Sequence, residues 1–527
     1  MRDAIVIGGG LNGLVAGAAI ARRGLATTIV DQRPEVGGAA VTSEIAPGFR
    51  APVLSHALGP IDPHVMRALR LDHAGIEFVM PDPALTSLGP DGRSLVFHRD
   101  PVLTAQSIHQ LSAGDASRWR GFLHTTQRIA ALIAELDHQT LPSIDDMRTR
   151  DWWPLVKLGR RVRKLGRQDL ARLTRWMPMA VADLAAEWFE SDLLQAALCA
   201  RAVFGNFAGP WSAGTGAMLL QWLAADAVPV GGGVTAKGGP GAVTQALAAI
   251  ATKAGAQIVT GARVTRISVR DGRASGVELD NGQALEARAI VAAIDPRRAI
   301  LDLVDPAELP VRFRERTKHI RARGVTAKIN LALSGAPVFP ALAGDSVPLR
   351  GRFLVAPNVD YIERAFDAAK YGEISAEPWL EVAVPSVLDP SLAPDGQHVM
   401  SIYAQFAPKQ LRGMDWSAGR ETLYRAVLRA LEPHVRGLES QVVARQILSP
   451  EDLERDWGAS GGHIFHGEPT LDQSWIARPQ LGWSQYRTPV AGLFLASAGT
   501  HPGGGLTGLS GWLAAQTVEQ ELAKRRH

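Results

Sequence analysis

The sequence contains very little of the residue types that define several protein classes. Cysteine occurs once among 527 residues, at Cys199. Counting alone therefore excludes a disulfide framework, a Cys-x-x-Cys redox pair and a metal site built from thiolates. Cys199 lies in the apolar run Leu-Gln-Ala-Ala-Leu-Cys-Ala, which favours a small buried residue over a reactive thiol.

Long hydrophobic runs are also missing, since no stretch approaches the roughly 18 consecutive apolar residues that a spanning helix needs. No secretory or transit segment is recognisable, because strand-like residues begin at Ala4, directly after Asp3. We therefore expect a cytoplasmic protein, with peripheral membrane association as an added expectation explained below.

A marked excess of one sign of charge occurs in a single segment only. The 56 Lys and Arg against 52 Asp and Glu give a net charge of +4. Eight of the basic residues stand against one aspartate between Lys157 and Arg175. Basicity confined to one segment, without interleaved aromatic residues, predicts no nucleic-acid partner.

Glycine, by contrast, is abundant at 53 residues, and one glycine-rich turn stands near the start of the chain. Gly8, Gly10 and Gly13 follow a strand-like segment and precede a predicted helix over about 11–23. This spacing lets backbone N–H groups approach a pyrophosphate, while the helix contributes its positive end. A second predicted strand, 27–30, ends at Asp31, where a carboxylate can accept hydrogen bonds from a ribose.

The loop after this acid favours FAD over NAD as the dinucleotide. An arginine and a Gly-Gly pair follow Asp31 at a spacing that recurs where a chain wraps the adenosine of FAD. The further cofactor contacts predicted for this half are Gln32, Arg33, Gly37, Gly38, Ala39 and, from a later strand, Val264.

A second glycine-rich turn lies near the other end of the chain, between a strand-like segment at 493–496 and a predicted helix at 511–524. Three consecutive glycines permit backbone contact with a flat ring, and a helix N-terminus beside the ring stabilises an anionic reduced flavin. The predicted flavin contacts are Gly499, Thr500, His501, Gly504, Gly505, Leu506 and Thr507.

Elements of cofactor-binding type recur at 1–84, 232–299 and 485–527. Asp271-Gly272 and Asn281-Gly282 add two hairpin turns within the middle segment. The stretches between, 85–231 and 300–484, are respectively mostly helical and mixed. We predict the α/β class: a discontinuous Rossmann-like FAD-binding domain, of the glutathione-reductase and amine-oxidase type, interleaved with a mixed α+β substrate-binding domain.

The glycine motifs, Asp31 and the block 238–244 resemble those of the phytoene-desaturase-type FAD oxidoreductases, a group that includes carotenoid isomerases and retinol saturases. The stretch Trp457–Glu468 is similar to the branch named pyridine nucleotide-disulfide oxidoreductase domain-containing protein 2. The resemblance spans essentially the whole chain. One departure is that Pro47-Gly48-Phe49 leads to Ala51–His56 and not to an Asp-x-Gly-Pro segment, so a carotenoid substrate is not implied directly.

The resemblance implies an FAD-dependent oxidoreductase that acts on a C–C bond of an apolar isoprenoid, polyene or acyl substrate. Desaturation by hydride transfer to flavin N5, with a quinone or oxygen as electron acceptor, is the first choice. An ene-saturase or a redox-neutral isomerase is the alternative among enzymes, and an amine oxidase is weaker. A flavin-containing, membrane-associated scaffold or assembly factor with little turnover is the alternative of another class.

Four side chains are candidates for acid–base chemistry or substrate contact. His56 follows the nucleotide loop, and Lys328 precedes an apolar strand at 329–333. His463 and His466 flank Ile-Phe. A purely structural role is the alternative for the histidines. For Lys328 the alternative is an ordinary lysine on an edge strand. No metal site is expected, because no cluster of carboxylate and cysteine accompanies these histidines.

A helical, partly basic region at 152–190 is the one segment that suggests a membrane. Such a helix can lie on an anionic bilayer with its basic side chains among the headgroups. A solvated basic face is the alternative, and two glycines weaken the helix. Its apolar residues recur on roughly one helical face: Leu158, Val162, Leu165, Leu173 and Trp176.

Overall fold

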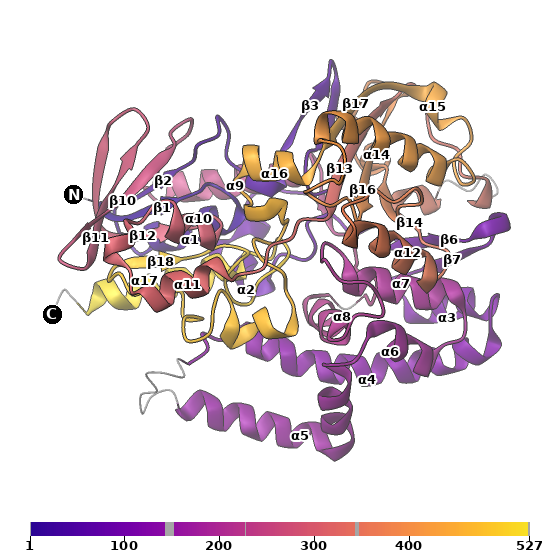
Figure 1. Ribbon diagram of the computed structural model, residues 1–527, viewed down its shortest axis with the longest axis horizontal. Coiled ribbons are helices and arrows are strands. Elements are labelled where there is room, and N and C mark those ends of the chain that lie inside the picture. The colour runs from indigo at the N-terminus through magenta and orange to yellow at the C-terminus, as the bar shows by residue number, and fades with distance from the viewer. Residues whose placement is uncertain (1, 143–151, 227, 343–346, 525–527) are drawn as a thin grey trace.

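The computed structural model describes residues 2–142, 152–226, 228–342 and 347–524, which build two seven-stranded sheets (Figure 1). Apolar alternation and runs in these segments supply the buried faces of both sheets. The first sheet has the order β10-β11-β12-β1-β2-β9, with β18 pairing β12. Its strands are β1 (Arg2–Ile7), β2 (Thr27–Val30), β9 (Gln257–Val259), β10 (Val264–Arg270), β11 (Arg273–Leu279), β12 (Ala284–Ala292) and β18 (Leu493–Leu495).

The first sheet is a parallel core extended by an antiparallel meander. Strand β1 lies parallel to β2 and β12, and β18 lies parallel to β12. The two predicted hairpins are confirmed, since β10–β11 and β11–β12 are antiparallel. Three segments far apart in the sequence thus share one sheet, which is the Rossmann-like arrangement expected for the FAD-binding domain.

Helices cover both faces of this sheet. One face carries α1 (Leu11–Arg22), α9 (Pro240–Lys253) and α17 (Leu509–Ala523), which share one apolar core with β1. The other carries α10 (Pro296–Leu301) and α11 (Val311–Lys318). Ile300 and Phe313 belong to that second core, so packing on the first sheet continues past residue 299.

The second sheet has the order β17-β13-β16-β15-β14-β6-β7. The first two strands of this sheet in chain order lie in the stretch 85–231, which the sequence predicted to be mostly helical. Short strands beside long helices give a weak alternating pattern in the sequence, which explains the difference. Helix α14 (Trp416–Leu431) packs on this sheet. The strands are β6 (Leu85–Leu88), β7 (Ser94–Phe97), β13 (Thr326–Leu333), β14 (Arg352–Val355), β15 (Leu380–Ala383), β16 (His398–Gln405) and β17 (Val442–Leu448).

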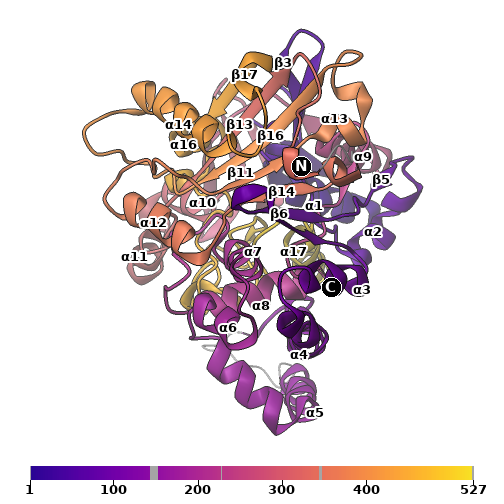
Figure 2. The ribbon, with the colours of Figure 1, turned by 90° about the vertical axis from the view of Figure 1, so that its right-hand side faces the viewer.

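A helical layer lies below the second sheet (Figures 1 and 2). Its members share one large apolar core. They are α3 (Pro101–His109), α4 (Ala113–Asp137), α5 (Trp152–Trp176), α6 (Val181–Trp188), α7 (Asp192–Val203), α8 (Thr215–Ala225) and α12 (Val359–Lys370). The smaller elements are β3 (Thr42–Ala46), β4 (Phe49–Pro52), β5 (Phe78–Val79), β8 (Thr235–Ala236), α2 (Pro63–Leu69), α13 (Pro385–Leu388), α15 (Leu438–Gln441) and α16 (Pro450–Trp457).

Helix α5 carries the basic segment at the edge of the molecule (Figures 1 and 2). Its apolar face contacts the protein, because Leu165 is buried and Leu158, Val162 and Leu173 pack against the core of α4. Gly166, with φ of 85°, interrupts the helix. The apolar stripe predicted to enter a bilayer is therefore partly covered by the protein itself.

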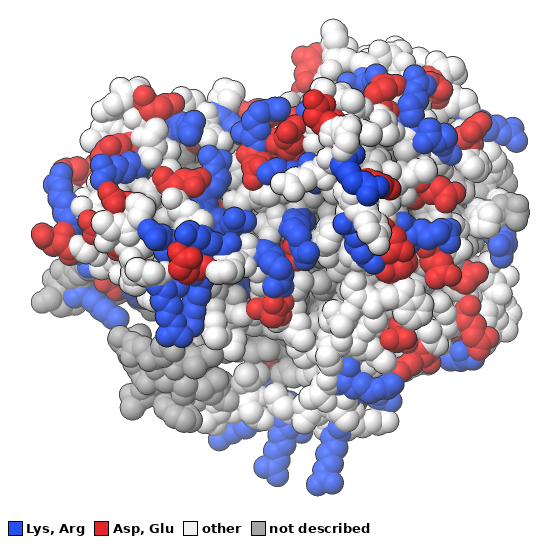
Figure 3. Space-filling view, in the orientation of Figure 1, with Lys and Arg blue, Asp and Glu red and all other residues white. Residues whose placement is uncertain are grey.

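Basic side chains of α5 remain on the surface. Arg161, Arg163, Lys164 and Arg167 are exposed, whereas the side chain of Lys157 lies outside the described part. Lys and Arg side chains project from the lower edge in Figure 3. Among the described residues, no helix combines the length and apolar character needed to cross a membrane.

Candidate functional site

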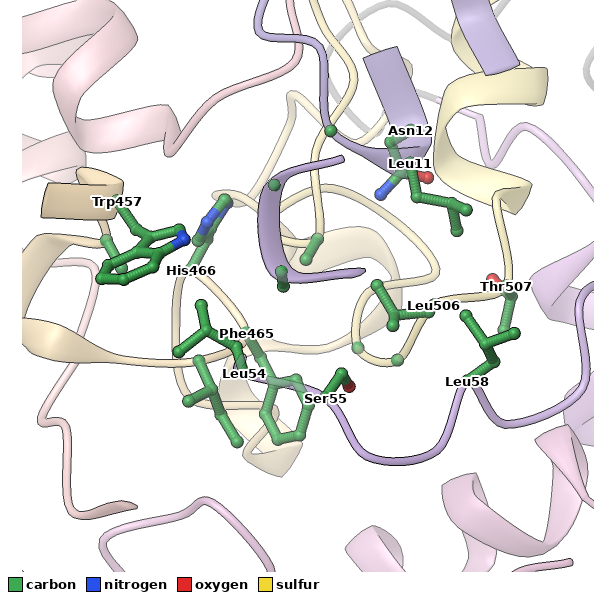
Figure 4. A pocket seen from close by; sticks show the side chains of 18 of the residues that line it. Leu11, Asn12, Leu54, Ser55, Leu58, Trp457, Phe465, His466, Leu506 and Thr507 are labelled. Atoms are coloured by element: carbon green, nitrogen blue, oxygen red, sulfur yellow. The ribbon is translucent and has the colours of Figure 1, made fainter. Parts of the chain in front are cut away.

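One cavity is lined by both glycine-rich turns (Figure 4). Gly8, Gly10 and Asp31 line it from the N-terminal turn, and Gly504 and Gly505 line it from the C-terminal turn. Figure 4 shows Trp457 and His466 on one side of the open space and Leu506 and Thr507 on the other. Two segments separated by almost the whole chain therefore border the same space.

The N-terminal turn is built by close backbone packing. Gly8 has φ of +100°, and a Cβ there would lie 2.8 Å from Ile294. A Cβ at Gly13 would lie 1.9 Å from the Gly8 carbonyl oxygen, so this glycine permits helix–strand contact and does not itself line the cavity. The buried Asp31 carboxylate accepts the Gly9 N–H at 2.6 Å and the Arg33 N–H at 2.8 Å. Burial raises the pKa of Asp31.

Two helix N-termini meet beside this turn, and both suit an anionic group. Helices α1 and α17 begin after Gly10 and Gly508, and neither has a side-chain cap or an acidic residue in its first turn. The Gly511 N–H donates to Asn12 Oδ1 at 3.2 Å, which fixes the two helix starts together. In α17 the Leu509 N–H also has an acceptor, Thr507 Oγ1 at 3.3 Å. The free N–H groups at the start of α1, together with the positive ends of both helices, match the pyrophosphate of a dinucleotide.

The C-terminal turn leaves open space for a flat ring. Gly504 and Gly505 have φ of +30° and +74°. A Cβ at either position would meet no side chain nearer than 4.0 Å. The backbone of this turn therefore faces the cavity directly, which fits the isoalloxazine of FAD. The predicted contacts Leu506 and Thr507 also line the cavity.

The remaining predicted cofactor contacts divide into two groups. Gln32, Arg33, Gly38, Ala39 and Val264 line the cavity, whereas Gly37, Gly499, Thr500 and His501 do not.

The second group shapes the turns. The Gly37 N–H donates to the Gly9 carbonyl at 2.8 Å, and Thr500 Oγ1 donates to the Ser497 carbonyl at 2.8 Å. Trp457 also lines the cavity, which the sequence did not indicate. Its ring centroid lies 4.5 Å from the guanidinium carbon of Arg33.

The four candidate catalytic side chains occupy different places. His56 and His466 line the cavity, whereas Lys328 and His463 are buried outside its lining. Lys328 lies on β13, between β17 and β16, and is not on an edge strand. Its Nζ donates to Asn330 Oδ1 at 2.8 Å and also to Ser401 Oγ. Burial lowers the pKa of Lys328 well below its ordinary value.

His56 belongs to a buried chain of polar contacts. Its Nε2 lies 3.0 Å from Glu381 Oε1, and Arg352 Nη1 donates to Glu381 Oε2 at 2.6 Å. Burial lowers the pKa of His56 to about 4, so the imidazole is neutral at pH 7. The Nε2–H then donates to the carboxylate, and Nδ1, which is shielded from solvent and has no partner among the described residues, keeps a free lone pair. The sequence analysis did not identify Glu381 and Arg352 as part of the site. The only sequence signal for them is that each is a charged residue within an otherwise apolar strand.

Aromatic side chains line the cavity beyond the C-terminal turn. Phe204 and Tyr403 meet edge to face with centroids 5.1 Å apart, and Trp222 and Phe465 lie 5.6 Å apart. Nothing in the sequence spacing of these residues indicated that they meet. Among the described residues, no group of three or more His, Cys, Asp or Glu side chains is arranged to hold a metal ion.

The end of helix α4 clamps the C-terminal turn. The Asp62 N–H donates to the Thr507 carbonyl at 3.0 Å, and His138 Nε2 lies 2.7 Å from Asp62 Oδ2. His501 Nε2 lies 3.2 Å from the Leu136 carbonyl oxygen. These contacts join the C-terminal end of α4, a helix of the layer below the second sheet, to the turn that borders the cavity.

This clamp predicts a pH dependence of stability. The hydrogen bond to Asp62 raises the pKa of His138 to about 9, from about 6.5 when unfolded. Its stabilising contribution is therefore complete below about pH 6.5 and is lost as the pH rises through 9. Because the imidazole is half exposed, we expect the loss to be about 1 kcal/mol at most. Urea unfolding across this range should show that fall in the wild type and not in His138→Phe; parallel curves would contradict it.

Comparison with known proteins agrees with this site. The family model described as flavin containing amine oxidoreductase matches residues 11–518. The chain is 34% identical to pyridine nucleotide-disulfide oxidoreductase domain-containing protein 2 of Rattus norvegicus, covering 99% of this chain and 94% of the relative. It is 26% identical to a phytoene desaturase (neurosporene-forming) of Cereibacter sphaeroides, covering 96% and 92%.

A solved structure shares the fold. Cyclohexylamine oxidase from Brevibacterium oxydans superposes with a TM-score of 0.60 at 16% identity, covering all of both chains. The match of the family model over nearly the whole chain, together with two glycine turns around one cavity, settles the assignment. The chain belongs to the flavin containing amine oxidoreductase family and is an FAD-dependent oxidoreductase.

Proposed function

We propose that this enzyme desaturates a C–C bond of an apolar isoprenoid or acyl substrate. The observation that carries the proposal is the aromatic lining of the cavity directly beyond Gly504 and Gly505. Phe204, Tyr403 and Phe465 offer a long apolar substrate extensive buried contact. The likeness to a phytoene desaturase supports a C–C bond as the reacting bond.

Desaturation requires the loss of a hydride and a proton from adjacent carbons, which leaves a double bond between them. Bound FAD supplies the hydride acceptor. His56 is the proposed proton acceptor, because it lines the cavity and is neutral at pH 7. Glu381 holds the imidazole through Nε2–H and would stabilise it once protonated. A quinone or oxygen is the proposed final electron acceptor.

An ene-saturase is the alternative within the same site, because the same groups catalyse the reverse addition of hydrogen. A scaffold with little turnover is the alternative of another class. Peripheral contact with an anionic membrane also remains a proposal; the exposed arginines of α5 support it, and the packing of its apolar face against the protein does not.

The test is the anaerobic visible spectrum of the FAD-loaded enzyme with saturated acyl and isoprenoid compounds and, separately, with NAD(P)H. A desaturase is reduced by its own substrate, and the product lacks two hydrogen atoms by mass spectrometry. His56→Gln should retain FAD and lose most of the reduction rate. Fast reduction by NAD(P)H alone would favour the saturase, and a flavin that no compound reduces would favour the scaffold.

A further inference from the structure

Arg201 is a cation inside the cavity that lacks a charged partner. It lies in the last turn of α7 and lines the cavity. Among the described residues, its guanidinium makes no ion pair and no hydrogen bond, and its Nε is shielded from solvent without a partner. Its contact is with the Trp222 ring, 4.1 Å from the guanidinium carbon. The side chain is partly buried, and a partly shielded charge without an acceptor is stabilised when a ligand supplies the opposite charge.

The protein makes room for this guanidinium. Gly231 has φ of +84°, and a Cβ there would lie 3.0 Å from the Arg201 guanidinium carbon. The neighbouring Asp226, which also lines the cavity, accepts the N–H groups of Val228 at 3.0 Å and Gly232 at 2.6 Å. The Asp226 carboxylate thus closes its own loop and forms no ion pair with Arg201.

The two guanidinium groups near Arg201 already have acceptors in the protein. Arg352 is matched by Glu381 at 2.6 Å. Arg99 lies beside the loop that Asp226 closes, and its Nη2 donates to the Gly232 carbonyl at 2.5 Å. Arg99 Nε also donates to the Pro81 carbonyl at 3.0 Å. Among the described residues, Arg201 is therefore the guanidinium of this set without a hydrogen-bond acceptor, and a ligand anion would supply one.

Arg201 also stands close to the reacting end of the cavity. The Trp222 ring that stacks on it borders Gly505, since a Cβ at Gly505 would lie 4.0 Å from this ring. A ligand anion held by Arg201 would share the cavity with the aromatic lining and would be within reach of the C-terminal turn. The free N–H groups of a guanidinium match the two oxygens of a carboxylate in geometry.

We propose that Arg201 binds the carboxylate of an amphipathic substrate whose apolar chain lies along Phe204, Tyr403 and Phe465. The inference rests on the proposed function and narrows its substrate class from apolar compounds in general to carboxylates with an apolar chain. The arginine holds one end of the molecule, and the aromatic lining holds the rest.

The test compares three ligands of equal chain length on the FAD-loaded enzyme: decanoate, 1-decanol and decyl phosphate. Binding is followed through the change in the flavin spectrum. Wild-type enzyme is expected to bind decanoate at least about tenfold more tightly than decanol, because decanoate forms a hydrogen-bonded charge pair with Arg201 and decanol does not. In Arg201→Gln the preference should disappear while decanol affinity stays the same. Arg270→Gln, which removes an exposed arginine of β10, is the matched control and should keep the preference.

Three outcomes overturn the proposal. These are equal binding of decanoate and decanol by the wild type, an unchanged preference in Arg201→Gln, and tighter binding of decyl phosphate than of decanoate. A structural role for Arg201 would lower the melting temperature of Arg201→Gln, whereas the proposed role predicts a melting temperature that is unchanged or higher without ligand.

The binding test and the desaturation test can fail separately. Binding of decanoate that depends on Arg201, without flavin reduction by any acyl or isoprenoid compound, would leave the carboxylate site standing and remove the desaturase. Reduction by a neutral hydrocarbon at the same rate in the wild type and Arg201→Gln would support the desaturase and contradict the carboxylate site.

Discussion

Replacing Gly10 with valine is expected to give a folded protein without FAD. Gly10 has an ordinary φ of −71°, and a Cβ there would meet only the Gly38 Cα at 3.8 Å, so the protein itself tolerates a side chain. The new side chain would project into the cavity where the backbone must approach the pyrophosphate, and FAD affinity should fall at least about tenfold. The ratio of flavin to protein absorbance measures this directly.

Gly335→Val is the matched control. A Cβ at Gly335 meets nothing within 4 Å, and Gly335 lies outside the cavity lining. This variant should keep its full FAD content, and circular dichroism should show both variants folded. Full FAD content in Gly10→Val would mean that the N-terminal turn does not border the cofactor.

Changing Glu381 to glutamine is expected to lower the free energy of unfolding by about 3–5 kcal/mol, because the buried Arg352 loses its counter-charge. His56 would also lose its charged acceptor. The double variant Arg352→Met/Glu381→Gln should recover part of this loss, since it removes the unpaired cation. Urea unfolding at fixed FAD saturation gives the comparison. Equal losses in the single and double variants would contradict the assignment of the loss to the unpaired cation.

The parts of the site that could be predicted from sequence are local in the chain. A glycine turn between a strand and a helix specifies its own geometry, so Gly8, Gly10 and Asp31 were found from their spacing alone. The C-terminal turn was found in the same way. The supporting contacts of Thr500 and His501 lie within such a turn too, and spacing does not tell a residue that faces the cavity from one that faces away.

The polar cluster could not be predicted, because its members come from distant segments. His56, Arg352 and Glu381 meet only when the loop after β4 reaches the second sheet. Arg201 arrives from a helix of the lower layer. Each residue appeared in the sequence as a single charge among apolar neighbours, which is equally typical of a surface position.

Helix α5 shows a different limit of prediction from the sequence. A stripe of apolar residues at helical spacing has the same period whether it packs on protein or on lipid. The structure packs Leu165 against the α4 core and leaves the basic residues outside. The sequence pattern correctly gave an amphipathic helix and could not identify which surface covers its apolar face.

The hydrogen bond between Asn12 and Gly511 has a consequence for how the enzyme is made in the cell. The first half of the cofactor site leaves the ribosome before its second half, and Gly511 follows Asn12 by 499 residues. Because both turns border one cavity, FAD can reach its final position only after α17 has been synthesised. Binding of the cofactor in that position is therefore a late event in the formation of the enzyme.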